Sequence, residues 1–564
     1  MKRNNQKEET LMKNRKMRIL AFGLSASLVF GSLAGCGKKS GSEKEAETES
    51  GAEVNVALTT DPDNLDASRA DDTAKNAIIL EVQETLVRFD ENGELKPAGA
   101  ESWDVSEDGL VYTFHLRDNQ YADGEDVVAA DYVNCMLRTL DPEVGSHDAG
   151  TFYVIEGAEE YNTGKAEKED VGVKAVDDQT LEITLKEAIP YFIQMANTSK
   201  LTPIPEENTQ GADNTSYGSD AEKMDYSGPF VIEEWQRGSG IVLKKNPNYW
   251  DADSVKLETV NYQLVQEENT RQQLFEQGKL DVLEGINDQY YEKIKADIDS
   301  GKTTLVELAK PGNSYICFNN QDPEGVFTNA KIRKAFSLAI DRETYVEKVL
   351  KKDTPAYGII PPATNNGDAK FRDNVEEPLM DTKEDAKALF EEGLEEIGKK
   401  AEDISIVFLQ GNANNDTKVK SEFFQNQWET TLGVKVKIDT AADNATFNST
   451  VSKGAYQICN TGWGADYNDP MTFMQLYTTG DGNNAPFASN EKYDQLISEC
   501  KTELDMKVRE TKFAEAEQIL ISEEACVAPL TYSLSKNLLN SNVKGISFNG
   551  AGGPAIEFKT AYVE

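Results

Sequence analysis

The residues that could perform catalysis are few in this sequence and lie far apart. The chain has 564 residues but only two histidines, and neither belongs to an HExxH zinc motif or to a serine or cysteine hydrolase motif. His115 lies in an alternating, exposed-looking strand pattern and His147 lies in a loop, so we interpret both as solvated surface residues. The sequence therefore favours no enzyme class that uses histidine as a base.

Three other fragments imitate chemical motifs but are incomplete. Residues 393–400 have the glycine spacing of a phosphate-binding loop, yet they lack its final Ser or Thr and lie in an acidic amphipathic pattern. Residues 533–536 match the SxxK of serine acyltransferases without an SDN or KTG partner. Asp61, Asp63 and Asp66 lack the glycine and the terminal glutamate of an EF-hand loop. We therefore predict no catalytic site, no metal and no cofactor.

The beginning of the chain carries the pattern of an export signal. Basic residues precede an apolar stretch at 19–34, which is shorter than the ~20 apolar residues needed to span a bilayer. A basic start, a short apolar core and small residues after it are typical of a secretion signal. The stretch ends in LAGC at 33–36, which resembles the lipobox of bacterial lipoproteins, in which the cysteine is acylated and becomes the first residue. We expect a signal peptide at 1–35 and lipid on Cys36; an ordinary signal with a chance cysteine is the alternative.

The chain after Cys36 is predicted to be a tethered body outside the cytoplasmic membrane. Residues 36–52 are rich in Gly, Ser, Lys and Glu and cannot form a core, so we expect a flexible tether. The rest exceeds the roughly 250–300 residues at which single cores stop growing, which predicts two or more domains. The formal net charge of −41 predicts an acidic surface that repels nucleic acid. We therefore expect a lipid-anchored protein at the extracytoplasmic face of the cell membrane, with no nucleic-acid partner.

The cysteines beyond Cys36 have no metal-binding or redox spacing. None of them forms a CxxC pair, and an odd number spread over a large body is not a disulfide scaffold. We interpret most of them as small buried hydrophobic residues, while one or two incidental disulfides stay open. They are Cys135, Cys317, Cys459, Cys500 and Cys526.

Hydrophobic periodicity predicts a β-rich first half and an alternating second half. Apolar alternation predicts strands at 54–58, 112–116, 230–232, 241–245, 404–408 and 434–438. Apolar residues at helical spacing predict a helix that contains Ala130, Val133, Leu137 and Leu140, and further helices at 332–340, 386–397 and 423–432. The strand, helix and strand between 404 and 438 predict a parallel βαβ unit, so the fold class is α/β.

Five segments, in order along the chain, resemble motifs of one protein family. Residues 100–117 (AESWDVSEDGLVYTFHLR) resemble the signature of the oligopeptide- and dipeptide-binding proteins of ABC transporters, which are bacterial extracellular solute-binding proteins of family 5. The further matches are 124–133, 228–250, 333–342 and 462–470 (GWGADYNDP). The resemblance covers essentially the whole chain after the tether, and five motifs in family order make it specific.

The resemblance implies a bilobed fold of the periplasmic-binding-protein type, in which two lobes close over a ligand and the first lobe carries an extra domain. Mapped onto this sequence, the first lobe would consist of 53–88, 200–310 and 528–564. The extra domain would be 89–199 and the second lobe 311–527.

The resemblance also implies where a ligand binds. In relatives that bind peptides, the peptide lies extended between the lobes and pairs with protein strands through its main chain. The matching segments here are the strand around Thr59 and Thr60 in the first lobe and the loop of Gly462, Trp463 and Gly464 in the second. The glycines at 462 and 464 would allow close approach of a backbone. Asp466 is the aspartate that would receive the free amino terminus of the peptide, and Tyr315 is a weaker candidate for the pocket.

The function that the resemblance implies is the capture of peptides, in the oligopeptide range, for delivery to an ABC transporter. The expected partners are peptides, the permease and ATPase subunits, and the membrane through the N-terminal lipid, with the protein itself a monomer. A peptide-sensing receptor, or a binder of an opine, a nickel complex or a sugar, is the alternative on the same fold. The histidine content disfavours the nickel branch.

Overall fold

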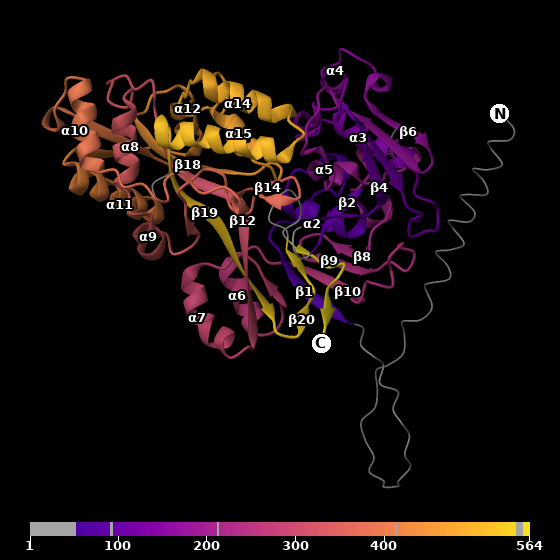
Figure 1. The fold of residues 1–564 in the computed structure, drawn as a ribbon. Helices are drawn as coiled ribbons and strands as arrows, with labels where there is room; N and C mark the ends of the chain where they lie inside the picture. The colour runs from indigo at the N-terminus through magenta and orange to yellow at the C-terminus, as the bar shows by residue number, and fades with distance from the viewer. Residues whose placement is uncertain (1–51, 91–93, 211–213, 412–413, 549–555) are drawn as a thin grey trace, which may run out of the picture. The chain divides into compact units, whose positions relative to one another are not determined.

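The structure is a computed structural model, and it describes residues 52–90, 94–210, 214–411, 414–548 and 556–564 (Figure 1). The predicted signal peptide, Cys36 and nearly all of the predicted tether lie outside these residues. Among the helices that the structure describes, none is both long and apolar enough to cross a bilayer.

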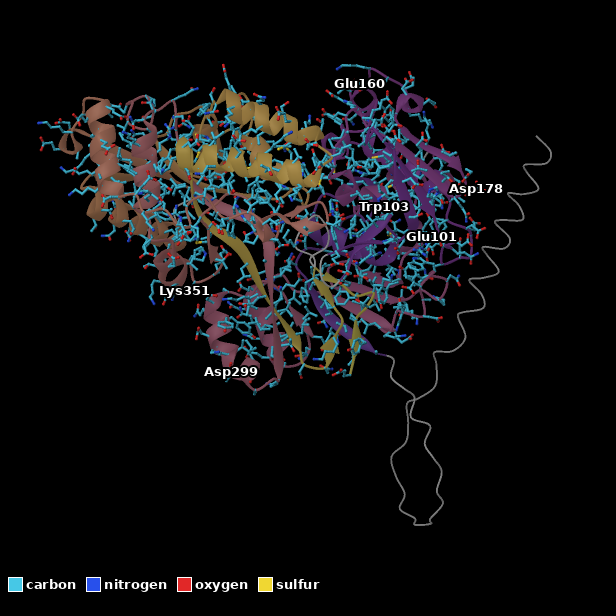
Figure 2. The ribbon with its side chains drawn as sticks, in the orientation of Figure 1. Glu101, Trp103, Glu160, Asp178, Asp299 and Lys351 are labelled. Atoms are coloured by element: carbon cyan, nitrogen blue, oxygen red, sulfur yellow. The ribbon has the colours of Figure 1, made fainter. Side chains whose placement is uncertain are left out.

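The surface agrees with the acidic composition of the chain. Glu160, Asp178 and Asp299, which lie on different elements, are all exposed (Figure 2). The two histidines also lie at the surface: the His115 side chain is 43% exposed and contacts Asp104 at 2.9 Å, and His147 is exposed. Their interpretation as solvated residues is confirmed.

One four-stranded sheet contains the first strand of the body. Its order is β1-β10-β9-β8, with β1 parallel to β10 and the other neighbours antiparallel. The strands are β1 (Glu53–Leu58), β8 (Phe230–Gln236), β9 (Gly240–Lys245) and β10 (Thr259–Leu264). Val54, Val56 and Leu58 are at most 4% exposed, which confirms the predicted alternation. The predicted hairpin of β8 and β9 is also confirmed.

A second four-stranded sheet is antiparallel throughout, in the order β4-β5-β7-β6. Its strands are β4 (Ala100–Val105), β5 (Val111–Leu116), β6 (Val173–Asp177) and β7 (Thr180–Thr184). The sheet is followed by α5 (Phe192–Met195) and is covered by α3 (Ala129–Leu140). All of these elements lie within the predicted extra domain.

The predicted helix over α3 is confirmed, but the apolar residues that predicted it are not all buried. Ala130 is exposed and Val133 is only partly buried, whereas Tyr132 and Met136 are almost fully buried. The reason is that two charged side chains of the buried face have partners. These are Asp131, which accepts a hydrogen bond from Tyr121, and Arg138, which pairs with Asp66 at 2.6 Å. Buried charges with partners cannot be recognised from apolar spacing.

The third large sheet has the order β11-β19-β12-β18-β16-β17. Its strands are β11 (Val282–Leu283), β12 (Thr303–Phe318), β16 (Ser405–Gln410), β17 (Lys435–Thr440), β18 (Ile458–Gly464) and β19 (Val527–Asn540), and β13 (Thr354–Pro355) pairs with β19. Strands β16 and β17 are parallel, with α11 (Asn415–Leu432) between them in the chain, so the predicted βαβ unit is confirmed.

Helices pack around this sheet. They include α8 (Ala330–Leu338), α10 (Ala386–Glu396), α14 (Glu491–Thr502) and α15 (Met506–Gln518). The helices predicted at 332–340, 386–397 and 423–432 are confirmed as α8, α10 and α11. Trp428 of α11 is fully buried and its indole donates to the carbonyl of Phe336 at 2.9 Å, which ties α11 to α8. All five cysteines in the described residues are free and buried, in agreement with their interpretation as small hydrophobic residues.

Two long strands, β12 and β19, run side by side through the whole length of this sheet (Figure 1). Their ladder is interrupted between Ala309 and Asn313, and the segment between them includes Pro311 and Gly312. Proline cannot donate to a ladder, so an interruption here is expected. The boundary predicted at 310 falls at this interruption, and the boundary predicted at 528 falls at the start of β19.

Candidate functional site

The end of β18 carries three of the predicted ligand residues in a row. Gly462, Trp463 and Gly464 are its last residues and lie opposite Ser314, Asn313 and Gly312 of β12. The Trp463 amide also donates to the Asn313 side-chain oxygen at 3.2 Å. The structure therefore makes this segment the end of a strand, where the sequence suggested a loop.

The outer edge of β18 is unpaired in this region. Strand β16 pairs with β18 only at Ile458 and Cys459, so from residue 460 to 464 no other described strand covers the edge that faces away from β12. Because an unpaired row of main-chain N–H and C=O groups is a template for adding another strand, residues 460–464 could pair with an extended segment.

The hydrogen-bond pattern shows which residues face that edge. The Asn319 amide donates to the Gln457 carbonyl, and the Ala465 amide donates to the Pro311 carbonyl, each at 2.9 Å. Because bonded and non-bonded pairs alternate in an antiparallel ladder, Trp463 directs its main-chain groups to β12. Gly462 and Gly464 direct theirs to the unpaired edge.

The two glycines differ in what surrounds them. A Cβ atom on Gly462 would lie 2.4 Å from the carbonyl oxygen of Asn313, so the neighbouring strand itself requires glycine there. A Cβ atom on Gly464 would meet nothing within 4 Å among the described atoms. A close approach of backbone was predicted at both glycines. In this structure only Gly462 has one, and the backbone that approaches it belongs to the protein's own strand β12.

The variant Gly462→Ala should therefore be destabilised, by about 1–3 kcal/mol, as expected for overpacking against a backbone atom. Gly464→Ala is the matched control on the same strand and should stay within about 0.5 kcal/mol of the unmodified protein. Urea unfolding followed by circular dichroism measures both. Equal losses for the two variants would contradict this account.

Asp466 follows β18 in the loop 465–470, which leads to α13 (Met471–Met474). The Thr472 hydroxyl accepts from the Asp466 amide at 3.1 Å and donates to its carboxylate at 3.3 Å. The surrounding protein removes water and raises the pKa of Asp466, while the side chains of Thr472 and Trp463 act in the opposite direction. No basic side chain in the described part of the chain forms an ion pair with this carboxylate, although the residue is accessible to solvent.

The far end of the same loop is fixed by a buried ion pair. Asp469 is 2% exposed and Arg509 is not exposed at all, and their side chains form two hydrogen bonds of 2.6 and 2.7 Å. Arg509 also donates to Asn366 at 3.1 Å and to the Cys500 carbonyl at 2.9 Å. Bidentate, charge-assisted bonds of this kind define orientation, so they hold the loop in one position on α15.

The remaining predicted site residues lie elsewhere. Thr59 and Thr60 are exposed and directly follow β1, in the four-stranded sheet with β8, β9 and β10. Tyr315 is only 4% exposed, lies opposite Thr461 in the ladder and packs edge-on against Tyr477 with ring centroids 6.0 Å apart. The structure thus brings together Gly462, Trp463, Gly464 and Asp466 at the end of β18, with Tyr315 buried on the neighbouring strand β12.

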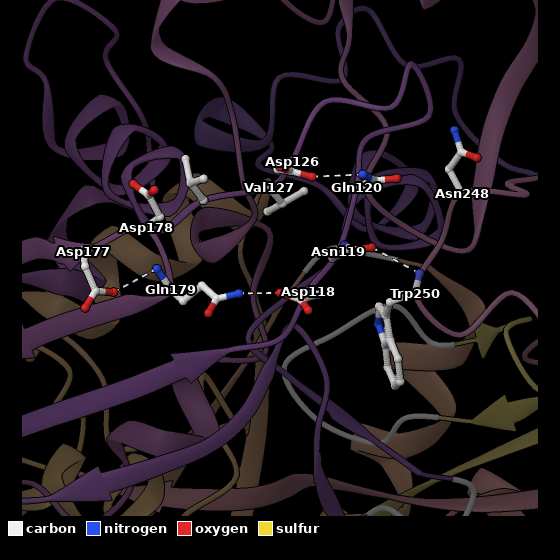
Figure 3. Close-up of a pocket in the computed structure, with 11 residues that line it drawn as sticks. Asp118, Asn119, Gln120, Asp126, Val127, Asp177, Asp178, Gln179, Asn248 and Trp250 are labelled. Atoms are coloured by element: carbon white, nitrogen blue, oxygen red, sulfur yellow. Dashed lines mark hydrogen bonds between the residues drawn. The ribbon is translucent and has the colours of Figure 1, made fainter.

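A cavity of about 790 Å³ opens at a different place, between the predicted extra domain and the segment that connects β9 to β10 (Figure 3). Its wall includes Asp118 and Asp126, which accept hydrogen bonds from Gln179 and Gln120. None of the predicted ligand residues lines it. Within the described residues no group of three or more His, Cys, Asp or Glu side chains could hold a metal ion.

Comparisons with known proteins agree with this architecture. The profile of "Bacterial extracellular solute-binding proteins, family 5 Middle" matches residues 94–485. The chain is 32% identical to the dipeptide-binding protein DppE of Bacillus subtilis over 94% of this chain and 97% of that protein. It is 30% identical to the oligopeptide-binding protein OppA of the same organism over 97% of this chain and 99% of that protein.

Solved structures show the same similarity. The unliganded open form of the murein tripeptide-binding protein MppA matches with a TM-score of 0.79 at 27% identity, covering 91% of this chain and 98% of that one. The OppA of Listeria monocytogenes bound to peptide matches with a TM-score of 0.65 at 28% identity, covering 91% and 99%. With its bilobed α/β fold, the chain belongs to family 5 of the bacterial extracellular solute-binding proteins.

Proposed function

We propose that this protein captures peptides between its two lobes and delivers them to an ABC permease in the cell membrane. The proposal rests on the edge of β18 at 460–464, which no other described strand covers, and on the accessible carboxylate of Asp466 just after it. Among the described residues, no basic side chain forms an ion pair with this carboxylate. An extended peptide requires these two features together: a strand edge for its main chain and a counter-charge for its amino terminus.

The chemistry follows from the geometry. Gly462 and Gly464 offer N–H and C=O groups to the peptide main chain, so affinity depends little on the side chains of the peptide. Asp466 receives the peptide ammonium, with Thr472 orienting the carboxylate. Thr59 and Thr60 would contact the peptide from the first lobe, and Tyr315 would support β18 from within the core.

Backbone pairing can be tested separately from charge. Calorimetry with a pool of synthetic tri- to pentapeptides should detect binding, and the best binder should then be compared with its N-methylated version. N-methylation at two peptide bonds removes two main-chain N–H donors of the peptide. Because each hydrogen bond contributes roughly 0.5–1.5 kcal/mol, binding should weaken about tenfold or more. Absence of binding by every peptide, or equal affinity of the N-methylated version, would contradict the proposal.

The two lobes should move on binding. The chain resembles an open, unliganded structure (TM-score 0.79) more than a peptide-bound one (TM-score 0.65), which supports a hinge along β12 and β19. X-ray scattering should show a smaller radius of gyration at saturating peptide. An unchanged radius would argue against closure.

We also propose that lipid on Cys36 anchors the protein at the extracytoplasmic face of the membrane, where it would meet the permease subunits that work with the ATPase subunits of the transporter. A single acyl chain binds membranes only marginally, so at least two are expected. Cys36→Ala should leave the protein uncleaved or released from the membrane, as seen by cell fractionation. Mature protein whose N-terminus carries no lipid mass would refute the anchor.

A further inference from the structure

The tip of the loop 465–470 touches a part of the chain that lies far away in sequence. The ring of Tyr467 lies flat against the ring of Tyr191, with centroids 4.4 Å apart and planes inclined by 2°. Tyr191 is only 5% exposed. The Arg509 guanidinium carbon lies 5.9 Å from the centroid of the Tyr191 ring. Tyr191 therefore contacts both the loop and the cation that fixes the far end of the loop.

Tyr191 is itself held by the core of the predicted extra domain. The Tyr112 hydroxyl of β5 donates to the Ile189 carbonyl at 3.3 Å, and the Tyr112 ring packs against Phe192 at 4.8 Å between centroids. Phe192 is fully buried. Because Ile189 and Phe192, which flank Tyr191 in sequence, are held in this way, Tyr191 presents a rigid surface to Tyr467.

Other contacts continue the same interface. Glu187 forms an ion pair with Lys501 of α14. A Cβ atom on Gly109, in the turn between β4 and β5, would lie 3.1 Å from a methyl carbon of Leu504, so that turn lies against the α14–α15 connection. The extra domain thus meets the second lobe beside the loop that carries Asp466.

The two ends of the loop are held differently. Asn468 and Asp469 are tied into the second lobe, through the Asn365 amide at 3.0 Å and through Arg509. Asp466 is held by the Thr472 hydroxyl and lies beside the Trp463 side chain, and the Tyr467 ring packs on the ring of Tyr191. Without Tyr191, the tip of the loop would lose its support on the side of the extra domain.

We infer that the extra domain positions the loop that carries Asp466, and that Tyr191 is the positioning residue, acting through Tyr467. The inference rests on the proposed function, because it assumes that Asp466 receives the peptide ammonium. It assigns the extra domain an indirect part in ligand binding, through the contact of Tyr191 with the loop of the second lobe.

The test is calorimetry with one peptide in two forms, free-amine and N-acetylated. Tyr191→Leu removes the ring but keeps an apolar side chain, and should weaken free-amine binding about three- to tenfold, the size expected of one aromatic pair. The acetylated form should change less than about twofold, since it brings no ammonium to position. Tyr191→Phe keeps the stacked ring and should bind both forms like the unmodified protein.

A double-mutant cycle adds a second readout. If Tyr191 acts through Tyr467, Tyr191→Leu and Tyr467→Leu together should cost no more than the larger single loss. Unchanged binding of both forms by Tyr191→Leu, equal losses for both forms, or additive losses in the double variant would overturn the inference. An unmodified protein that does not distinguish the two peptide forms would instead refute the role of Asp466, and this inference with it.

Discussion

Replacing Asp466 with alanine is expected to weaken the binding of a free-amine peptide by about a hundredfold or more. A peptide ammonium that enters a closed cleft loses water, and this is costly unless a counter-charge meets it. Removing one partner of a buried charge pair costs on the order of 3–5 kcal/mol, and each 1.4 kcal/mol is about tenfold in affinity. The Asp466 carboxylate has no basic partner among the described residues, so it is available for this charge.

The N-acetylated form of the same peptide is the control. It brings no charge, so Asp466→Ala should weaken its binding much less. Asp466→Asn keeps the size of the side chain and should behave like the alanine variant toward the free-amine form. Equal losses for both peptide forms would assign Asp466 to the fold, where it would serve only to orient the loop through Thr472.

Breaking the ion pair between Asp469 and Arg509 is expected to lower the free energy of unfolding by about 3–5 kcal/mol, because the remaining charge is buried without a partner. Both side chains are almost completely buried, and both hydrogen bonds between them are short. Asp469→Ala and Arg509→Met should each show the loss in urea unfolding. Since the pair holds the loop of Asp466, peptide affinity should fall as well.

Two controls make this prediction specific. Lys331 forms solvent-accessible ion pairs with Glu392 at 2.9 Å and with Glu396 at 2.8 Å, and Lys331→Ala should cost less than about 1 kcal/mol. Replacing Asp469 and Arg509 together by apolar residues should cost less than either single change, because no charge is then left alone. Single variants as stable as the unmodified protein would show that the pair does not hold the loop.

The regular elements were largely predictable from local patterns. Strict alternation located β1 and β5, and the strand, helix and strand over 404–438 became the parallel pair of β16 and β17 with α11 between them. The buried face of α3 was not predictable, because Asp131 and Arg138 are buried with partners that lie elsewhere in the chain. Apolar spacing contains no information about such partners.

The candidate site was predictable only in part, for a similar reason. The motif at 462–470 located the end of β18 and Asp466, because these residues are continuous in sequence. The partner of Asp469 lies 40 residues further on, at Arg509. The partner of Tyr467 is Tyr191, which lies far away in sequence, in the predicted extra domain. Long-range pairs of this kind leave no local pattern, so only the fold could identify them.

The central claim, that the cleft holds a peptide by its main chain and its amino terminus, is tested most directly by native mass spectrometry of the protein purified from its own cells. The account predicts a protein that carries a mixture of peptides of varied sequence, all with free amino termini, and an Asp466→Ala variant that carries far less. A single non-peptide ligand would contradict the claim. So would peptides with blocked amino termini that the Asp466→Ala variant retains as well as the unmodified protein does.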